Sequence, residues 1–143
     1  MDHVVYVDAK ANELTEILNG NKTMIIRGAA GRKMPYGRVS QGDMLYLIEN
    51  DGSGLVRARA KVVSVFNSEK MSQADSILLV EKNQDKLQLT TSQTKRWAGK
   101  RYLILIEIDQ VEVLDGFRID KRDFGNMDDW LPVENIEKVK TDP

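Results

Sequence analysis

The residues best equipped for chemistry are five cations that lie within one short stretch, residues 20–43. They are Lys22, Arg27, Arg32, Lys33 and Arg38, and the first acidic residue of this stretch is Asp43. Three glycines lie between Arg27 and Arg38, where they let the backbone come close to a ligand. Because the whole chain has a formal charge of only −1, this concentration predicts a surface that faces an anion.

A second basic segment, residues 86–106, also lacks acidic residues. Its cations are Lys86, Lys95, Arg96, Lys100 and Arg101. The balance reverses over residues 107–137, which hold ten acids against three cations. Such polarity predicts electrostatic steering of a charged partner. Either basic segment taken alone is equally consistent with ordinary surface charge.

Composition and length exclude several kinds of protein. The 143 residues (16.2 kDa) fit one domain, residues 1–143, and 41% hydrophobic with 30% charged residues is typical of a folded globular chain. There is no cysteine, so disulfides and thiolate metal sites are excluded. The single histidine, His3, argues against a histidine-based metal cluster or catalytic triad. Four aspartates at positions 120–129 do not match a calcium loop, so neither metal nor cofactor is expected.

No apolar run approaches the roughly 18 residues of a membrane span, and the first residues lack the features of a signal peptide. The sequence therefore predicts a cytoplasmic protein that does not contact a membrane. Its oligomeric state cannot be read from the sequence.

Local patterns in the first half predict strands joined by tight turns around one helix. The expected strands are Val4–Val7, Thr23–Ile26, Met44–Glu49 and Leu55–Phe66. A helix is expected from Asp8 to Asn19, with Gly20 as its left-handed C-terminal cap. The turn Asp51–Gly54 predicts an antiparallel hairpin.

In the second half the pattern becomes helical before it returns to strands. A helix is expected from Ser68 or Ser72 to about Lys86, with Ile77, Leu78 and Val80 facing inward, and another from Thr91 to Trp97. The longest apolar run, Arg101–Val113, predicts a central strand, followed by a short strand at Phe117–Ile119. Asp120–Pro132 is expected to be irregular, with Phe124 and Trp130 covering one end of the core, and Val133–Val139 fits a strand or a helical turn.

These elements together predict a mixed α+β, mainly β protein. The expected architecture is a small antiparallel barrel of about five to six strands with two to three flanking helices. A parallel Rossmann-like sheet fits less well, because the Asp51–Gly54 hairpin is antiparallel and no strand–glycine–helix fingerprint occurs.

The motif Gly20-x-Lys22-x-x-x-x-Arg27, followed by Gly42-Asp43, resembles the ASCH domain, a branch of the PUA-like superfamily. The order of elements matches as well, over about residues 10–115, which leaves an acidic C-terminal extension of about 116–143. One position departs from the family pattern, because its usual Glu is Ile25 here.

The resemblance implies a PUA-like pseudobarrel with a cleft that binds RNA or a modified nucleotide or nucleoside. The cleft would be lined by Lys22 and Arg27. The loop Arg32–Arg38, which we call the basic loop, carries Arg32, Lys33 and Arg38 and suits phosphate contacts. Arg96 and Lys100 are expected to contribute further contacts. Tyr36 and Trp97 are candidates for stacking on a base, although the helical position of Trp97 also suits a core anchor.

Two other functions stay open. Some proteins that resemble the ASCH family are amidohydrolases of acylated nucleosides such as acetylated cytidine, and use a Lys, a Thr three residues later and a Glu. Here only Lys22 matches. Ile25 replaces the Thr, so Thr23 or a water would be the nucleophile, and Glu69 or Glu81 the acid. In the third hypothesis, the acidic residues 107–137, including Asp128 and Asp129, contact a basic protein partner.

Overall fold

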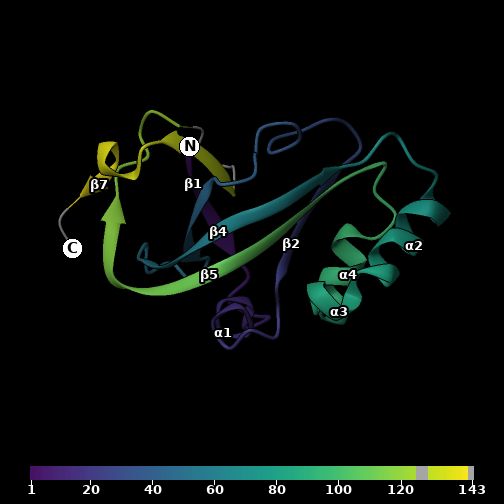
Figure 1. Ribbon diagram of the computed structural model, residues 1–143, viewed down its shortest axis with the longest axis horizontal. Helices are drawn as coiled ribbons and strands as arrows, with labels where there is room; N and C mark the ends of the chain where they lie inside the picture. The colour runs from purple at the N-terminus through teal and green to yellow at the C-terminus, as the bar shows by residue number, and fades with distance from the viewer. Residues whose placement is uncertain (125–128, 142–143) are drawn as a thin grey trace.

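A strongly curled sheet forms most of the computed structural model, which describes residues 1–124 and 129–141 (Figure 1). Its strands are β1 Asp2–Val7, β2 Met24–Ala29, β3 Met44–Glu49, β4 Val56–Asn67, β5 Tyr102–Ile119, β6 Trp130–Glu134 and β7 Lys140–Thr141. The order across the sheet is β2-β5-β4-β3-β1-β6, with β7 paired to β5. The predicted mainly β, barrel-like fold with flanking helices is confirmed.

The sheet is mixed rather than wholly antiparallel. β3 and β4 form the predicted hairpin, and β5 lies antiparallel to both β4 and β2. β1, however, pairs with β3 in parallel, with Val4 opposite Tyr46. A parallel neighbour needs a long connection, and α1 and β2 lie in the chain between these two strands.

Two of the three predicted helices are shorter than expected, whereas the third, Thr91–Trp97, has the predicted bounds. The helices are α1 Glu13–Leu18, α2 Gln73–Lys82, α3 Gln84–Leu87 and α4 Thr91–Trp97, with a 3₁₀ turn, η1, at Ile136–Lys138. The Asp8 carboxylate accepts the Ala11 N–H (3.2 Å) as a cap would, but Asn12 then adopts a left-handed conformation (φ 53°), so α1 begins only at Glu13. Ser72 caps α2 as expected, and Thr90 and Gln93 form a capping box on α4.

Helices α2, α3 and α4 lie together at one end of the sheet (Figure 1). Val80 is buried there, but the predicted inward positions of Ile77 and Leu78 are wrong, because their side chains are exposed. Only one face of a surface helix meets the core, and α2 turns Ser76 and Val80 toward it. At Asn83 the helix ends and α3 begins, so the predicted single helix to Lys86 is broken.

The C-terminal part contributes more strand than predicted. β5 continues without a break through Phe117–Ile119, and β6 begins at Trp130, inside the segment expected to be irregular. Val133–Val139 contains both of the alternatives considered, the end of β6 and the turn η1. β6 pairs with β1, with Val4 opposite Leu131, so the predicted extension completes the sheet.

Apolar side chains fill the interior of the curl. The largest cluster includes Val5, Leu45, Ile106 and Trp130, and a second lies beneath α2, α3 and α4 around Leu87 and Leu103. Trp130 is 1% exposed, in line with its predicted core position. Within the described residues, no helix has the length and apolar character needed to cross a membrane.

Candidate anion-binding cleft

Arg27 on β2 lies at the centre of the candidate cleft, although its side chain is almost completely buried (8% exposed). Its Nη1 donates to the Ile26 carbonyl (2.8 Å) and its Nη2 to the Tyr6 carbonyl (2.7 Å). The guanidinium carbon lies 5.7 Å from the ring centre of Trp97 and 5.6 Å from that of Trp130. Two carbonyls and two indoles therefore fix the orientation of this guanidinium.

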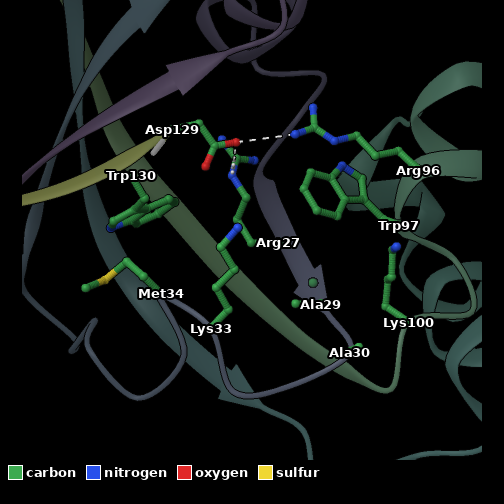
Figure 2. A pocket seen from close by; sticks show the side chains of 11 residues that line it. Arg27, Ala29, Ala30, Lys33, Met34, Arg96, Trp97, Lys100, Asp129 and Trp130 are labelled. Carbon is green, nitrogen blue, oxygen red and sulfur yellow. Dashed lines mark ion pairs between the residues drawn. The ribbon is translucent and has the colours of Figure 1, made fainter. Parts of the chain in front are cut away.

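The remaining nitrogen of Arg27 faces Asp129. Oδ2 of Asp129 lies 3.3 Å from Arg27 Nε and 3.6 Å from Arg96 Nη2, so one carboxylate bridges two cations (Figure 2). The Nε–H of Arg27 nevertheless has no hydrogen-bond partner among the described residues. The backbone carbonyl of Asp129 accepts the Tyr6 N–H (2.9 Å), which fixes the main chain at this position.

Two hollows meet at this bridge. We call the first, of about 370 Å³, the basic hollow; it is lined by Arg27, Gly28, Ala29, Ala30, Lys33, Met34, Arg96, Trp97, Lys100, Asp129 and Trp130. The second, of about 230 Å³, is the polar hollow; it is lined by Tyr6, Asp8, Glu13, Ile26, Arg27, Asn50, Gln93, Arg96, Trp97, Lys121 and Asp129. Arg27, Arg96, Trp97 and Asp129 belong to both, so they divide a single cleft into two parts.

The basic hollow is lined by residues from both basic segments of the sequence that lack acids, residues 20–42 and 86–106. Lys33 comes from the first segment, and Arg96 and Lys100 come from the second, more than sixty residues later. Pairing of β2 with β5 brings these segments together, with Ala29 opposite Tyr102. The structure thus places four of the predicted binding residues, Arg27, Lys33, Arg96 and Lys100, around one cavity.

Three other predicted binding residues line neither hollow. The guanidinium of Arg32 lies 5.6 Å from the ring centre of Tyr36 and 5.7 Å from that of Tyr102, and Arg38 is exposed farther along the loop. Tyr36 donates its hydroxyl hydrogen to the Ser68 carbonyl and packs edge-on against Tyr102. Tyr36 therefore anchors the basic loop rather than lining the cavity.

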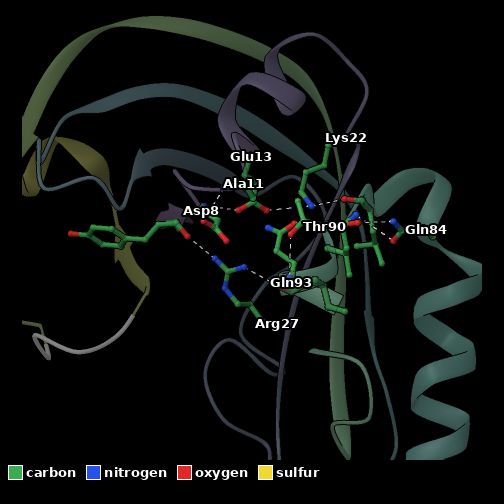
Figure 3. A network of polar contacts seen from close by, with 12 residues as sticks. Asp8, Ala11, Glu13, Lys22, Arg27, Gln84, Thr90 and Gln93 are labelled. Carbon is green, nitrogen blue, oxygen red and sulfur yellow. Dashed lines mark hydrogen bonds and ion pairs between the residues drawn. The ribbon is translucent and has the colours of Figure 1, made fainter. Parts of the chain in front are cut away.

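Lys22 is also separate from the two hollows. Its side chain is 2% exposed, with Nζ donating to the Leu87 carbonyl at 2.6 Å and lying 3.3 Å from Glu13 Oε2 (Figure 3). Glu13 is itself buried, and its Oε1 accepts the Asp8 N–H (2.8 Å). Burial lowers the pKa of Lys22, and the Glu13 carboxylate opposes that shift. Together with the Leu87 carbonyl, this pair ties α1 to the C-terminal end of α3.

The catalytic residues predicted for an amidohydrolase are not assembled by this arrangement. The carboxylate beside Lys22 is Glu13, whereas Glu81 is exposed on α2. Thr23 follows Lys22, and its backbone N–H donates to the Lys86 carbonyl (2.9 Å). Glu13 precedes the motif on α1, so the motif itself gave no signal for it.

A buried polar chain supports the wall formed by Trp130. Its indole N–H donates to Nδ1 of His3 (3.0 Å), and Nε2 of His3 lies 2.8 Å from Oδ2 of Asp43. These contacts require a neutral imidazole with its proton on Nε2. Burial lowers the pKa of His3, which stabilises this neutral form, although the Asp43 hydrogen bond acts in the opposite direction.

The same series of hydrogen bonds gives a structural role to Asp43, the aspartate of the Gly42-Asp43 part of the motif. Besides His3, Asp43 Oδ2 accepts the Ser40 N–H (2.9 Å). Asp43 thus fixes the start of β3 and, through His3, the indole of Trp130. Neither His3 nor Trp130 was predicted to belong to the site.

The described residues contain no group of three or more histidine, aspartate or glutamate side chains arranged to hold a metal ion. Of the aspartates considered in the sequence, Asp120 pairs with Arg122 and Asp129 with Arg27 and Arg96. Asp128 lies outside the described residues.

Comparison with known proteins gives a clear result only for structure. No family model matches the sequence, and no curated protein shows significant sequence similarity to it. Three solved structures of an ASCH protein from Zymomonas mobilis align over nearly the whole chain. The first is the ASCH structure itself, with a TM-score of 0.64 and 14% identity over 93% of this chain and 89% of that one.

The other two are point mutants of the Zymomonas mobilis protein. A tyrosine-to-phenylalanine mutant aligns with a TM-score of 0.69 and 14% identity, over 96% of this chain and 94% of that one. A serine-to-alanine mutant aligns with a TM-score of 0.66 and 13% identity, over 96% and 92%. The chain has the ASCH fold. The resemblance of its motif to the ASCH domain is thereby confirmed at the level of the fold, and the alignment includes most of the C-terminal part that the motif did not cover.

Proposed function

We propose that this ASCH-fold chain binds RNA or a nucleotide, with phosphate groups held in the basic hollow. The observation that carries the proposal is the convergence of the two acid-free segments on one cavity. Lys33 and Lys100 are exposed at its rim, and within residues 1–124 and 129–141 neither side chain forms an ion pair. Exposed ammonium groups of this kind neutralise phosphates and release counterions.

The aromatic floor of the cleft suits a nucleobase. The Arg96 guanidinium lies 4.4 Å from the ring centre of Trp97, and Arg96 is half exposed. The outer face of a guanidinium that already stacks on an indole can accept a base on its other side. Single-stranded RNA or a free nucleotide presents such a base, whereas a duplex keeps its bases stacked inside.

The polar hollow adds groups that can pair with the edge of a base. Asn50 and Gln93 carry amides, and Asp8 carries a carboxylate that accepts hydrogen bonds. These groups share the polar hollow with Lys121 and with the two arginines that border both hollows. The cleft therefore offers a phosphate region and a base region on either side of Arg27.

A salt titration of binding to a short single-stranded RNA tests the proposal. Lys33→Ala and Lys100→Ala should weaken binding, and each should reduce the slope of log affinity against log salt by about 0.7, the value for one phosphate contact on a single strand. Lys61→Ala is the matched control, because Lys61 is an exposed cation of β4 that lines neither hollow. Unchanged slopes in both cleft variants, or an equal loss in the control, would contradict the proposal.

The other two functions receive less support. Hydrolysis of an acylated nucleoside would need Lys22 to activate a nucleophile, but its ammonium is held by Glu13 and Leu87. A basic protein partner would need free carboxylates in residues 107–137. Several of these pair with cations of the chain itself: Glu107 with Lys86, Glu112 with Arg59, Asp120 with Arg122, and Glu134 with Lys138.

A further inference from the structure

The buried Nε–H of Arg27 has no hydrogen-bond acceptor among the described residues, although both Nη atoms of the same side chain donate to carbonyls. A buried charged donor without an acceptor is unfavourable, and such groups in native proteins call for an explanation. Arg27 lines both hollows, so this donor lies at their junction, where a ligand atom in the place of the Asp129 carboxylate would be within its reach.

The carboxylate of Asp129 lies at this junction without completing the interaction. Its Oδ2 is 3.3 Å from Arg27 Nε and 3.6 Å from Arg96 Nη2, so it balances their charge without a well-formed hydrogen bond to Nε. A phosphate oxygen at the same position would accept hydrogen bonds from both guanidinium groups, which favour phosphate and carboxylate alike. Figure 2 shows the Asp129 carboxylate with ion pairs to both arginines, among the side chains that line the basic hollow.

We propose that this junction is a phosphate site, and that Asp129 occupies it in the free protein as an exchangeable counterion. The inference rests on the proposed function and adds a location: one phosphate lies between Arg27 and Arg96, where the basic and polar hollows meet. The neighbouring phosphates of a bound single-stranded RNA then lie along Lys33 and Lys100.

The exchange needs only a rotation of one side chain. The main chain at Asp129 is fixed by its hydrogen bond from Tyr6, and the next residue, Trp130, is buried. The Asp129 side chain itself is 39% exposed, so it can turn toward water without opening the core. Arg27 stays in place, because its two carbonyl partners and the two indoles hold it.

The bridging carboxylate therefore competes with the ligand. Asp129→Asn keeps the shape of the side chain and removes its charge, so it should strengthen phosphate binding about two- to fivefold, the effect of a partly exposed ion pair. The salt slope for single-stranded RNA should increase by up to about 0.7, because Arg96 and Arg27 become available to a phosphate. If Asp129 had a purely structural role, Asp129→Asn would change the stability of the protein without strengthening phosphate binding.

The experiment uses the whole chain and two probes, a labelled single-stranded RNA and inorganic pyrophosphate. Pyrophosphate binding is followed by tryptophan fluorescence, because Trp97 and Trp130, the two tryptophans of the chain, both flank Arg27. Asp115→Asn is the matched control, because it removes one exposed negative charge of β5 outside both hollows. Tighter binding of pyrophosphate by Asp129→Asn than by Asp115→Asn is the expected result.

Equal or weaker pyrophosphate binding by Asp129→Asn, or no binding by any form, would overturn the phosphate site. If the chain fails to bind RNA but Asp129→Asn still strengthens pyrophosphate binding, the phosphate site stands and RNA is not the ligand. If RNA binding depends on Lys33 and Lys100 but does not respond to Asp129→Asn, the proposed function stands and the exchange does not.

Discussion

The indole N–H of Trp130 donates a hydrogen bond to Nδ1 of His3, and both side chains are buried. This contact connects β6 to β1 within the sheet and places the indole 5.6 Å from the Arg27 guanidinium. Because His3 also contacts Asp43, the residue before β3, one imidazole connects β1, β6 and the start of β3 beside the cleft.

Removal of the imidazole should destabilise the protein markedly. His3→Ala leaves both the Trp130 N–H and the Asp43 carboxylate without their buried partner, so we expect a loss of about 2–4 kcal/mol in the free energy of unfolding. His3→Gln should lose less unfolding free energy, because the amide of glutamine has both a hydrogen-bond donor and an acceptor. Urea unfolding measures the loss, and Lys10→Ala, an exposed position, is the control. Equal stability of His3→Ala and the control would contradict the described contacts.

The same imidazole should make stability depend on pH. Burial lowers its pKa below the ordinary value of 6.5, so between the folded and unfolded values the unfolded chain binds more protons. The contribution of neutral His3 is therefore complete above pH 6.5 and is lost as the pH falls through the folded pKa. We expect the difference in unfolding free energy between the wild type and His3→Gln to shrink from about pH 8 to about pH 5. A difference that stays constant over this range would show that His3 does not titrate in this way.

The Lys22–Glu13 pair should behave as a structural unit. Lys22→Met leaves Glu13 as a buried, unpaired charge and should cost about 3–5 kcal/mol of unfolding free energy. Adding Glu13→Gln removes that charge, so the double variant should be more stable than Lys22→Met alone. A double-mutant cycle by urea unfolding measures the coupling. If the losses in unfolding free energy of the two single variants add up to the loss of the double variant, Lys22 and Glu13 are not energetically coupled.

Gly28 should not tolerate a side chain, because a Cβ there would lie 2.6 Å from Leu103 Cδ2 and 3.1 Å from the Tyr102 carbonyl oxygen. Gly28→Ala pushes on the core strand β5 behind the basic hollow and should cost about 1–3 kcal/mol. Gly31→Ala, in the loop that follows β2, is the control, since a Cβ there meets no heavy atom within 4 Å. Thermal unfolding measures the difference in stability between Gly28→Ala and Gly31→Ala. If Gly28→Ala is as stable as Gly31→Ala, the close packing against Leu103 is not present.

Features determined by neighbouring residues were predictable from the sequence. The hairpin at Asp51–Gly54, the cap at Gly20 and the helix from Thr91 to Trp97 all depend on local turn and capping signals, and all three are present. The clustering of cations was also informative, because Lys33, Arg96 and Lys100 do meet.

Features determined by distant contacts were not predictable in this way. His3 was considered in the sequence only as an argument against a histidine-based metal cluster or triad, yet β1, which carries it, lies inside the sheet between β3 and β6. Asp129 belongs to an acidic segment and gave no sign that it would lie between two arginines. Lys22 matches the motif, but only the fold shows that Glu13 and Leu87 enclose it.

The pairing of β1 with β6 also has a consequence for biosynthesis. Val4 and Leu131 are opposite one another, so the ribosome must make almost all of the described chain before either strand gains this neighbour. Trp130, one wall of the basic hollow, arrives equally late. A nascent chain that has already folded α1 and the β3–β4 hairpin would thus still lack a closed cleft. Contacts between residues so far apart also slow folding, so the cleft should be among the last parts of the molecule to form.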